Sequence, residues 1–196
     1  MLASRNLVFF QEPRPEFIPG LTESLLTVSG QYSGWRQQTV DVSAHKNRTV
    51  RLVFYYQTTT SFTADLQLDD INIDGNLSTF ESSSDWTAWQ TTTTNNVNTL
   101  YHNAAFSFVD TSNATGRWSR DVGGTGSSGT GLTYDHTFSS TGGGYLYAET
   151  SVSPHPWGFW LRSPIITLSN SPTVTFWEAR YGATMGTCDV YLDIIG

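Results

Sequence analysis

Hydrophobic residues in this chain occur in short alternating runs that turn-forming residues interrupt. The clearest run covers residues 49–56, where every second residue is apolar. Such alternation is typical of a β-strand with one buried face. About ten runs of this kind, separated by turn signals, predict an all-β sandwich of two antiparallel sheets. The longest unbroken apolar run is only a few residues, far below the ~18 that a membrane-spanning helix requires.

The charge balance excludes another class of protein. The 196 residues include 10 Lys and Arg against 17 Asp and Glu, which gives a net charge of −7. Binding to nucleic acid phosphates requires a concentrated basic face, and an acidic chain does not supply one. We therefore expect neither a nucleic acid partner nor a membrane span.

Cysteine usage indicates the compartment in which the chain folds. Cys188 is the single cysteine, which excludes an intrachain disulfide and a zinc site built on thiolates. Its alternation with Val190 and Leu192 favours a small buried hydrophobe over a reactive thiol. Residues 1–13 do not fit a signal peptide, because polar residues interrupt their apolar stretch. These features are typical of a protein made in a reducing cytoplasm.

Motifs for catalysis do not stand out. The four histidines lie in different segments and form neither H-x-x-x-H nor H-E-x-x-H. The glycine-rich stretch Gly123–Gly131 has no lysine and no strand-to-helix transition beside it, so we interpret it as a mobile loop and not a phosphate-binding loop. We expect a protein without enzymatic activity and without a required cofactor.

Residues 1–20 differ from the rest of the chain. Three prolines and a glycine in their second half favour an extended N-terminal arm, since proline supports neither a helix interior nor a strand ladder. The arm carries apolar side chains that suit docking to a partner: Phe9, Phe10, Phe17 and Ile18.

Several motifs in the later part of the chain follow one another in a familiar order. They are Asp135–Thr137, Gly144–Glu149, Leu161–Pro164, Val174–Trp177, Tyr181-Gly182 and Gly186–Leu192, with Phe80-Glu81 and Trp86 before them. In order and spacing they resemble the first half of a MAM domain, the extracellular jelly roll named after meprin, neuropilin and receptor phosphatase mu. The resemblance covers roughly residues 78–192. The family relies on disulfides, and its cysteine positions near Ser78 and Thr173 are not cysteines in this chain.

The earlier part of the chain resembles the second half of the same family. Its motifs are Glu23–Leu26, Ser29-Gly30, Trp35-Arg36, Val50–Tyr56 and Leu68–Ile71. The resemblance implies one MAM-like jelly-roll domain over residues 21–196 in circularly permuted order. Residues 21–77 would be the family's C-terminal half and residues 78–196 its N-terminal half. The short connector Asp74–Leu77 favours closure within one chain, and strand exchange between neighbouring chains is the alternative.

Two candidate sites follow from these positions. In a permuted fold Asp70, Glu81 and Asp135 would come together, and their oxygens suit a structural calcium or sodium ion. The alternative is that Asp69 and Asp70 cap strand ends by accepting backbone N–H groups. Trp157 lies among turn-forming residues, where an indole suits a glycan or a partner protein, although core packing is the alternative for the neighbouring Phe159 and Trp160.

The resemblance implies adhesion or self-association and not turnover of a substrate. We therefore expect a structural or adhesion subunit of a larger assembly, specifically a phage virion protein that decorates a capsid or builds a tail or fibre. Its partners would be copies of itself or other virion proteins, and it would be made in the host cytoplasm. The alternative is an extracellular carbohydrate-binding module that presents Trp157 to cell-surface glycans.

Overall fold

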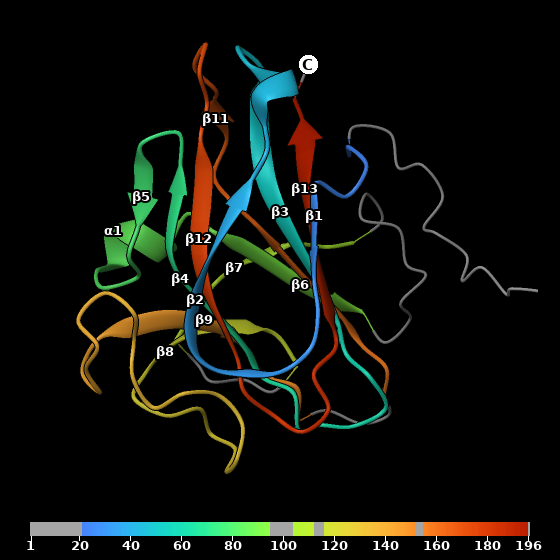
Figure 1. Ribbon diagram of the computed structural model, residues 1–196, viewed down its shortest axis with the longest axis vertical. Coiled ribbons are helices and arrows are strands. Elements are labelled where there is room, and N and C mark those ends of the chain that lie inside the picture. The colour runs from blue at the N-terminus through green and yellow to red at the C-terminus, as the bar shows by residue number, and fades with distance from the viewer. Residues whose placement is uncertain (1–20, 95–103, 112–115, 152–154, 196) are drawn as a thin grey trace, which may run out of the picture.

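Two antiparallel β-sheets pack face to face in the computed structural model, which describes residues 21–94, 104–111, 116–151 and 155–195 (Figure 1). The all-β, two-sheet sandwich expected from the alternation is confirmed. The strands are β1 (Leu26–Val28), β2 (Tyr32–Val40), β3 (Thr49–Gln57), β4 (Leu66–Ile73), β5 (Asn76–Ser78), β6 (Gln90–Thr94), β7 (Ser107–Phe108), β8 (Trp118–Val122), β9 (Gly144–Ala148), β10 (Gly158–Arg162), β11 (Ile166–Thr167), β12 (Val174–Arg180) and β13 (Thr187–Ile194).

The earlier and later parts of the chain interleave in both sheets. Sheet A has the order β1-β13-β3-β10-β6-β7, with β11 beside β3, and sheet B has the order β2-β12-β4-β9-β8, with β5 beside β4. Strand β3 thus lies between β13 and β10, and β4 lies between β12 and β9. Each central strand from residues 21–77 needs neighbours from the later residues, so the two parts share one core within one chain.

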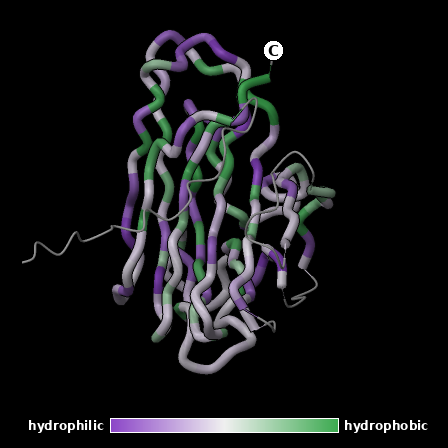
Figure 2. Tube along the Cα trace, turned by 90° about the vertical axis from the view of Figure 1, so that its right-hand side faces the viewer, coloured by the Kyte–Doolittle hydropathy of each residue, from purple (hydrophilic) through white to green (hydrophobic). Residues whose placement is uncertain are grey.

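The apolar side chains that alternate along the strands fill that core. Hydrophobic and hydrophilic residues alternate along the chain in Figure 2. On β3 the residues Val50, Leu52, Phe54 and Tyr56 are fully buried in the main core cluster. The Phe54 ring meets Phe176 of the opposite sheet edge-on, with ring centroids 5.0 Å apart. Cys188 is also fully buried there, which confirms its role as a small hydrophobe.

The two ends of the described chain lie side by side on sheet A. Leu21 forms an isolated antiparallel bridge with Asp193, and the N–H of Thr22 donates to the carbonyl of Leu192 at 2.9 Å. Strand β1 then continues along β13. The place where the described chain begins is therefore next to the place where it ends.

The alternation of buried residues along β4 breaks between Leu68 and Ile71, at Asp69-Asp70, and the structure has a β-bulge there. Asp70 has a φ of 44°, and the register between β4 and β12 shifts between Thr175 and Trp177. The extra residue returns Ile71 and Ile73 to the buried face. It also lets two consecutive carboxylates, Asp69 and Asp70, contact the same loop.

Two local features differ from the alternation pattern. Residues Ser83–Trp86 form the short helix α1, where the N–H of Ser82 donates to the carboxylate of Asp85 at 3.3 Å. A 3-10 turn covers Ser43–His45. Residues 104–109 contain only the two-residue strand β7, and both of its residues are exposed.

Candidate functional site

A row of polar residues on the outer face of β4 holds the glycine-rich loop between β8 and β9. Asp65, just before the strand, accepts a hydrogen bond from the Thr130 hydroxyl at 2.7 Å. The side-chain amide of Gln67 donates to the carbonyl of Leu132 and accepts its N–H. Asp69 accepts two backbone N–H groups from the same loop. All three side chains are fully buried, so the loop expected to be mobile is fastened to sheet B at three points.

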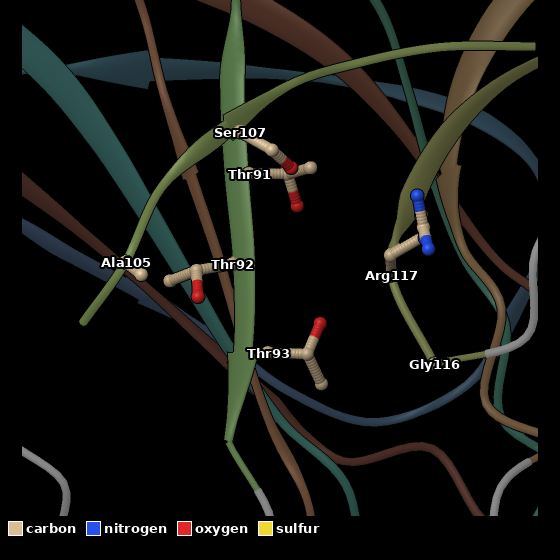
Figure 3. A pocket seen from close by; sticks show the side chains of 7 residues that line it. All are labelled: Thr91, Thr92, Thr93, Ala105, Ser107, Gly116 and Arg117. Carbon is tan, nitrogen blue, oxygen red and sulfur yellow. The ribbon is translucent and has the colours of Figure 1, made fainter.

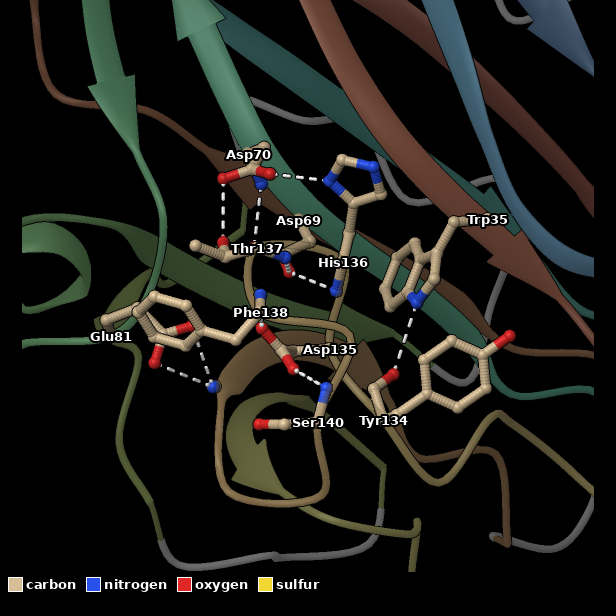
Figure 4. Close-up of polar contacts among 11 residues, drawn as sticks. Trp35, Asp69, Asp70, Glu81, Tyr134, Asp135, His136, Thr137, Phe138 and Ser140 are labelled. Carbon is tan, nitrogen blue, oxygen red and sulfur yellow. Dashed lines mark hydrogen bonds and ion pairs between the residues drawn. The ribbon is translucent and has the colours of Figure 1, made fainter.

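Further along this loop, Asp135 closes a tight turn. Its two carboxylate oxygens accept the N–H groups of Phe138 at 2.6 Å and Ser140 at 2.8 Å (Figure 4). Glu81 lies beside this turn and accepts the N–H of Gly144 at 3.0 Å. Asp135 therefore binds backbone donors within the loop, and Glu81 binds the first backbone donor of β9.

A histidine stands above the bulge of β4. The Nδ1 of His136 lies 2.6 Å from a carboxylate oxygen of Asp70, whose other oxygen accepts the Thr137 hydroxyl at 2.8 Å. The imidazole stacks on the Trp177 ring with centroids 3.7 Å apart, and Trp35 meets it edge-on at 6.2 Å. His136 thus fixes the turn to two strands of sheet B.

Burial controls the protonation of these carboxyls. Burial, followed by the negative charge of Asp70, raises the pKa of Asp69 to about 8, although three backbone N–H groups act in the opposite direction. Burial and the charge of Glu149 raise the pKa of Asp65 to about 6. Burial is also the largest cause that raises the pKa of Glu81. Asp69 is therefore protonated near neutral pH.

The proposed cation ligands are only partly brought together. Glu81 and Asp135 interact, since the charge and the hydrogen bond of Asp135 contribute to the raised pKa of Glu81. Asp70 instead binds His136 and Thr137. Over the described ranges, no group of three or more His, Cys, Asp or Glu is placed to hold a metal ion. The alternative interpretation, in which Asp69 and Asp70 cap backbone N–H groups, fits Asp69, which accepts the N–H groups of His136 and Thr137. It does not fit Asp70, which binds two side chains.

A calcium or sodium ion at Asp70, Glu81 and Asp135 therefore stays a prediction that the geometry does not favour. If the site binds an ion, millimolar Ca²⁺ or Na⁺ should raise the melting temperature, and Asp135→Asn should remove that rise. A melting curve that neither ion moves would contradict it.

A polar hollow lies between β6, β7 and the start of β8 (Figure 3). Its described lining consists of Thr91, Thr92, Thr93, Ala105, Ser107, Gly116 and Arg117. The Thr91 hydroxyl donates to the carbonyl of Trp160 at 3.1 Å, so it is committed to the strand ladder. Arg117 pairs with Asp110 at 3.4 Å. The hollow is polar because threonine and serine hydroxyls and the paired Arg117 line it. None of its described lining residues can act as a general acid or base.

Trp157 packs inward. It is partly buried against the main core cluster, and its backbone N–H donates to the Thr58 hydroxyl at 2.8 Å. Phe159 lies in the same core, whereas Trp160 stacks on Tyr55 on the other face of sheet A with ring centroids 4.1 Å apart. Core packing therefore applies to Phe159, and a glycan-binding role of Trp157 stays a prediction. Phe9, Phe10, Phe17 and Ile18 lie outside the described residues.

The structure contains a buried ion pair on β12 that was not predicted from the sequence. The Arg180 Nη1 lies 3.7 Å from the Glu178 Oε2, and both side chains are fully buried. Arg180 also donates to the carbonyls of Gly30 and Gly186, and Gln38 donates to Glu178 at 2.7 Å. The signal was present, because both residues continue the buried face of Val174 and Phe176.

Comparison with known proteins gives the family. The described residues contain no helix that is both long and apolar enough to span a membrane. No solved structure matches the chain. Residues 75–194, well over half of the chain, match the model of the MAM domain, meprin/A5/mu. The match covers the motifs of the later part of the chain, from Phe80-Glu81 to Gly186–Leu192, and the fold is the expected antiparallel sandwich. The chain therefore belongs to the MAM domain family.

Proposed function

We propose that this chain is a structural, non-enzymatic subunit of a larger assembly and acts through protein–protein contacts. Membership of the MAM family carries the proposal, since the family consists of adhesion-type domains that mediate such contacts. The polar groups of the site agree with it, because the carboxylates of Asp69, Asp135 and Glu81 bind backbone N–H groups between β8 and the start of β9 and hold that segment in place.

The assembly we propose is a virion, in which the chain decorates a capsid or forms part of a tail or fibre. With one cysteine the chain folds without an intrachain disulfide, and burial raises the pKa of the Cys188 thiol and keeps it inert. A reducing cytoplasm is therefore compatible with its folding. Particles released from a cell would then carry this adhesion-type domain outside.

We also propose that the domain is circularly permuted. The family match begins at residue 75, yet residues 21–74 supply β1, β2, β3 and β4 to both sheets. In this proposal residues 21–77 are the family's C-terminal half, placed before residues 78–196, and residues 1–20 form the arm. The adjacency of Leu21 and Asp193 supports it, since permutation needs neighbouring ends.

The proposal is tested by replacing the apolar side chains of the arm in the full-length chain. We expect the chain to exceed 21.7 kDa in light scattering and to be found by mass spectrometry in purified particles. Phe9→Ser, Phe10→Ser, Phe17→Ser and Ile18→Ser together should reduce the mass to that of one chain. A mass of 21.7 kDa for both the unaltered chain and the serine variant, together with absence of the chain from purified particles, would refute a role in assembly.

A further inference from the structure

Strand β2 leaves one edge of sheet B open. It has nine residues and pairs with β12 alone among the described residues. The other edge strands are much shorter: β1 has three residues, β7 two and β8 five. A long edge strand presents a row of backbone N–H and C=O groups to any extended segment that can pair with it.

The open edge has few of the features that normally protect one. It contains no proline, and Arg36 is its one charged residue. The side chains of Arg36, Gln37 and Thr39 are exposed. An irregularity occurs only at its beginning, where Gly34 has a φ of 88° and the register with β12 shifts. The regular part, Trp35–Val40, is therefore available for pairing.

The chain itself contains a segment that suits this edge. Residues 5–12 read Arg-Asn-Leu-Val-Phe-Phe-Gln-Glu, which is eight residues without proline or glycine and with four apolar residues at the centre. β-branched and aromatic residues favour an extended strand, and the length matches that of β2. The arm from Pro13 onward cannot pair in the same way, because its prolines lack N–H donors.

The spacer between this segment and the sandwich favours a neighbouring molecule. Residues 13–20 include three prolines and join the segment to Leu21 on sheet A. A proline-rich spacer is semi-rigid, at about 3.1 Å per residue. Its stiffness disfavours folding of residues 5–12 back onto the molecule that carries them, and a reach of up to roughly 25 Å is enough for pairing with a neighbouring molecule.

From this geometry we infer that residues 5–12 of a second copy add as a strand to the β2 edge and extend its sheet B. The inference rests on the proposed function and names the surface that receives the arm. Because the donor strand and the acceptor edge are different surfaces, the contact is head-to-tail and can continue from copy to copy.

Two full-length variants separate the donor from the acceptor. Val8→Pro with Phe10→Pro removes ladder donors from the arm, and Gln37→Lys with Thr39→Lys places charge on two exposed positions of β2. We expect each variant alone to be a single chain in light scattering, and an equimolar mixture to form a complex of twice that mass. The control Asn170→Lys with Ser171→Lys adds the same charge at exposed positions away from β2 and should associate like the unaltered chain.

Hydrogen exchange supplies the second measurement. The amides of Trp35–Val40 should exchange at least tenfold more slowly in the unaltered chain than in the Val8→Pro, Phe10→Pro variant, and dilution should remove the difference. Protection that survives dilution would assign the edge to the chain's own arm and overturn the inference. If the arm serine variant dissociates while the β2 lysine variant does not, the arm docks elsewhere and the proposed function stands. If neither dissociates, the chain associates through another surface and the inference fails. If the unaltered chain is itself a single chain and is absent from purified particles, the proposed function fails as well. Equal circular dichroism melts ensure that the variants are folded.

Discussion

The carboxyl groups of this chain act mainly on backbone donors. Asp135 binds two N–H groups of its own turn, and Asp69 binds the loop that covers sheet B. A buried carboxyl that must hold a loop faces two opposing effects, since hydrogen bonds favour its charged form and burial favours its neutral form. At Asp69 burial is the stronger effect, with a pKa of about 8.

This balance predicts a pH-dependent stability. The pKa of Asp69 is raised from 3.8 to about 8 in the folded state, so the folded state retains a proton that the unfolded state has lost. Stability should therefore fall as the pH rises from about 4 to 8 and level off above 8. Thermal melts of Asp69→Asn should lose this part of the decline. Asp65→Asn is the matched control and should alter only the range up to pH 6, where its own pKa lies. Parallel pH profiles for Asp69→Asn and the unaltered chain would contradict the assignment.

The buried pair on β12 gives a second prediction. Arg180→Met leaves the fully buried Glu178 without its partner and frees two carbonyls, which should cost about 3–5 kcal/mol in the free energy of unfolding. Adding Glu178→Gln should recover part of the loss, because the remaining group is then neutral. Urea denaturation measures both variants. A loss below about 1 kcal/mol for Arg180→Met would show that the pair does not support the fold.

At the scale of elements, the Asp135 turn packs closely against Gly143, the residue just before β9. A Cβ added at Gly143 would lie 2.2 Å from the Asp135 Cγ. Gly143→Ala should therefore displace the Asp135 turn and cost about 1–3 kcal/mol. Gly142→Ala, whose nearest atom would be 3.9 Å away, is the control and should change little. Equal denaturation midpoints for both variants would refute the contact.

The same elements show which local signals could be read from the sequence. Alternation located β3, β4, β12 and β13, because each has one face in the core and side chains alternate with a period of two. The Asp69-Asp70 break marked the bulge for the same reason. Alternation offers no equivalent signal for α1, a single turn in which the N–H of Ser82 donates to the carboxylate of Asp85. It also did not show that Gln67 would hold a loop 65 residues later.

At the scale of the whole molecule, the interleaved sheets predict that the order of the two parts can be reversed. A chain that begins at Gly75, continues from Gly196 to Met1 and ends at Asp74 keeps every residue and uses residues 1–20 as the connection. The described ends lie side by side, and the cut falls in the turn between β4 and β5. We expect its melting temperature to stay within a few degrees of the original. The closed arm should no longer reach a neighbour, so self-association should disappear. A reordered chain that fails to fold would argue against the permuted domain.

Local alternation and the ordered motifs were sufficient to predict the fold class, the family and most strand positions. Three features depended on the tertiary structure: the core shared by both parts of the chain, the hydrogen bonds from β4 to the loop between β8 and β9, and the different partners of Asp69, Asp70 and Asp135. The physical reason is sequence separation: Asp69 and His136 lie 67 residues apart, and only pairing of β4 with β12 and β9 brings their elements together. The sequence shows which side chains are present, but their hydrogen-bond partners depend on which strands become neighbours in the fold.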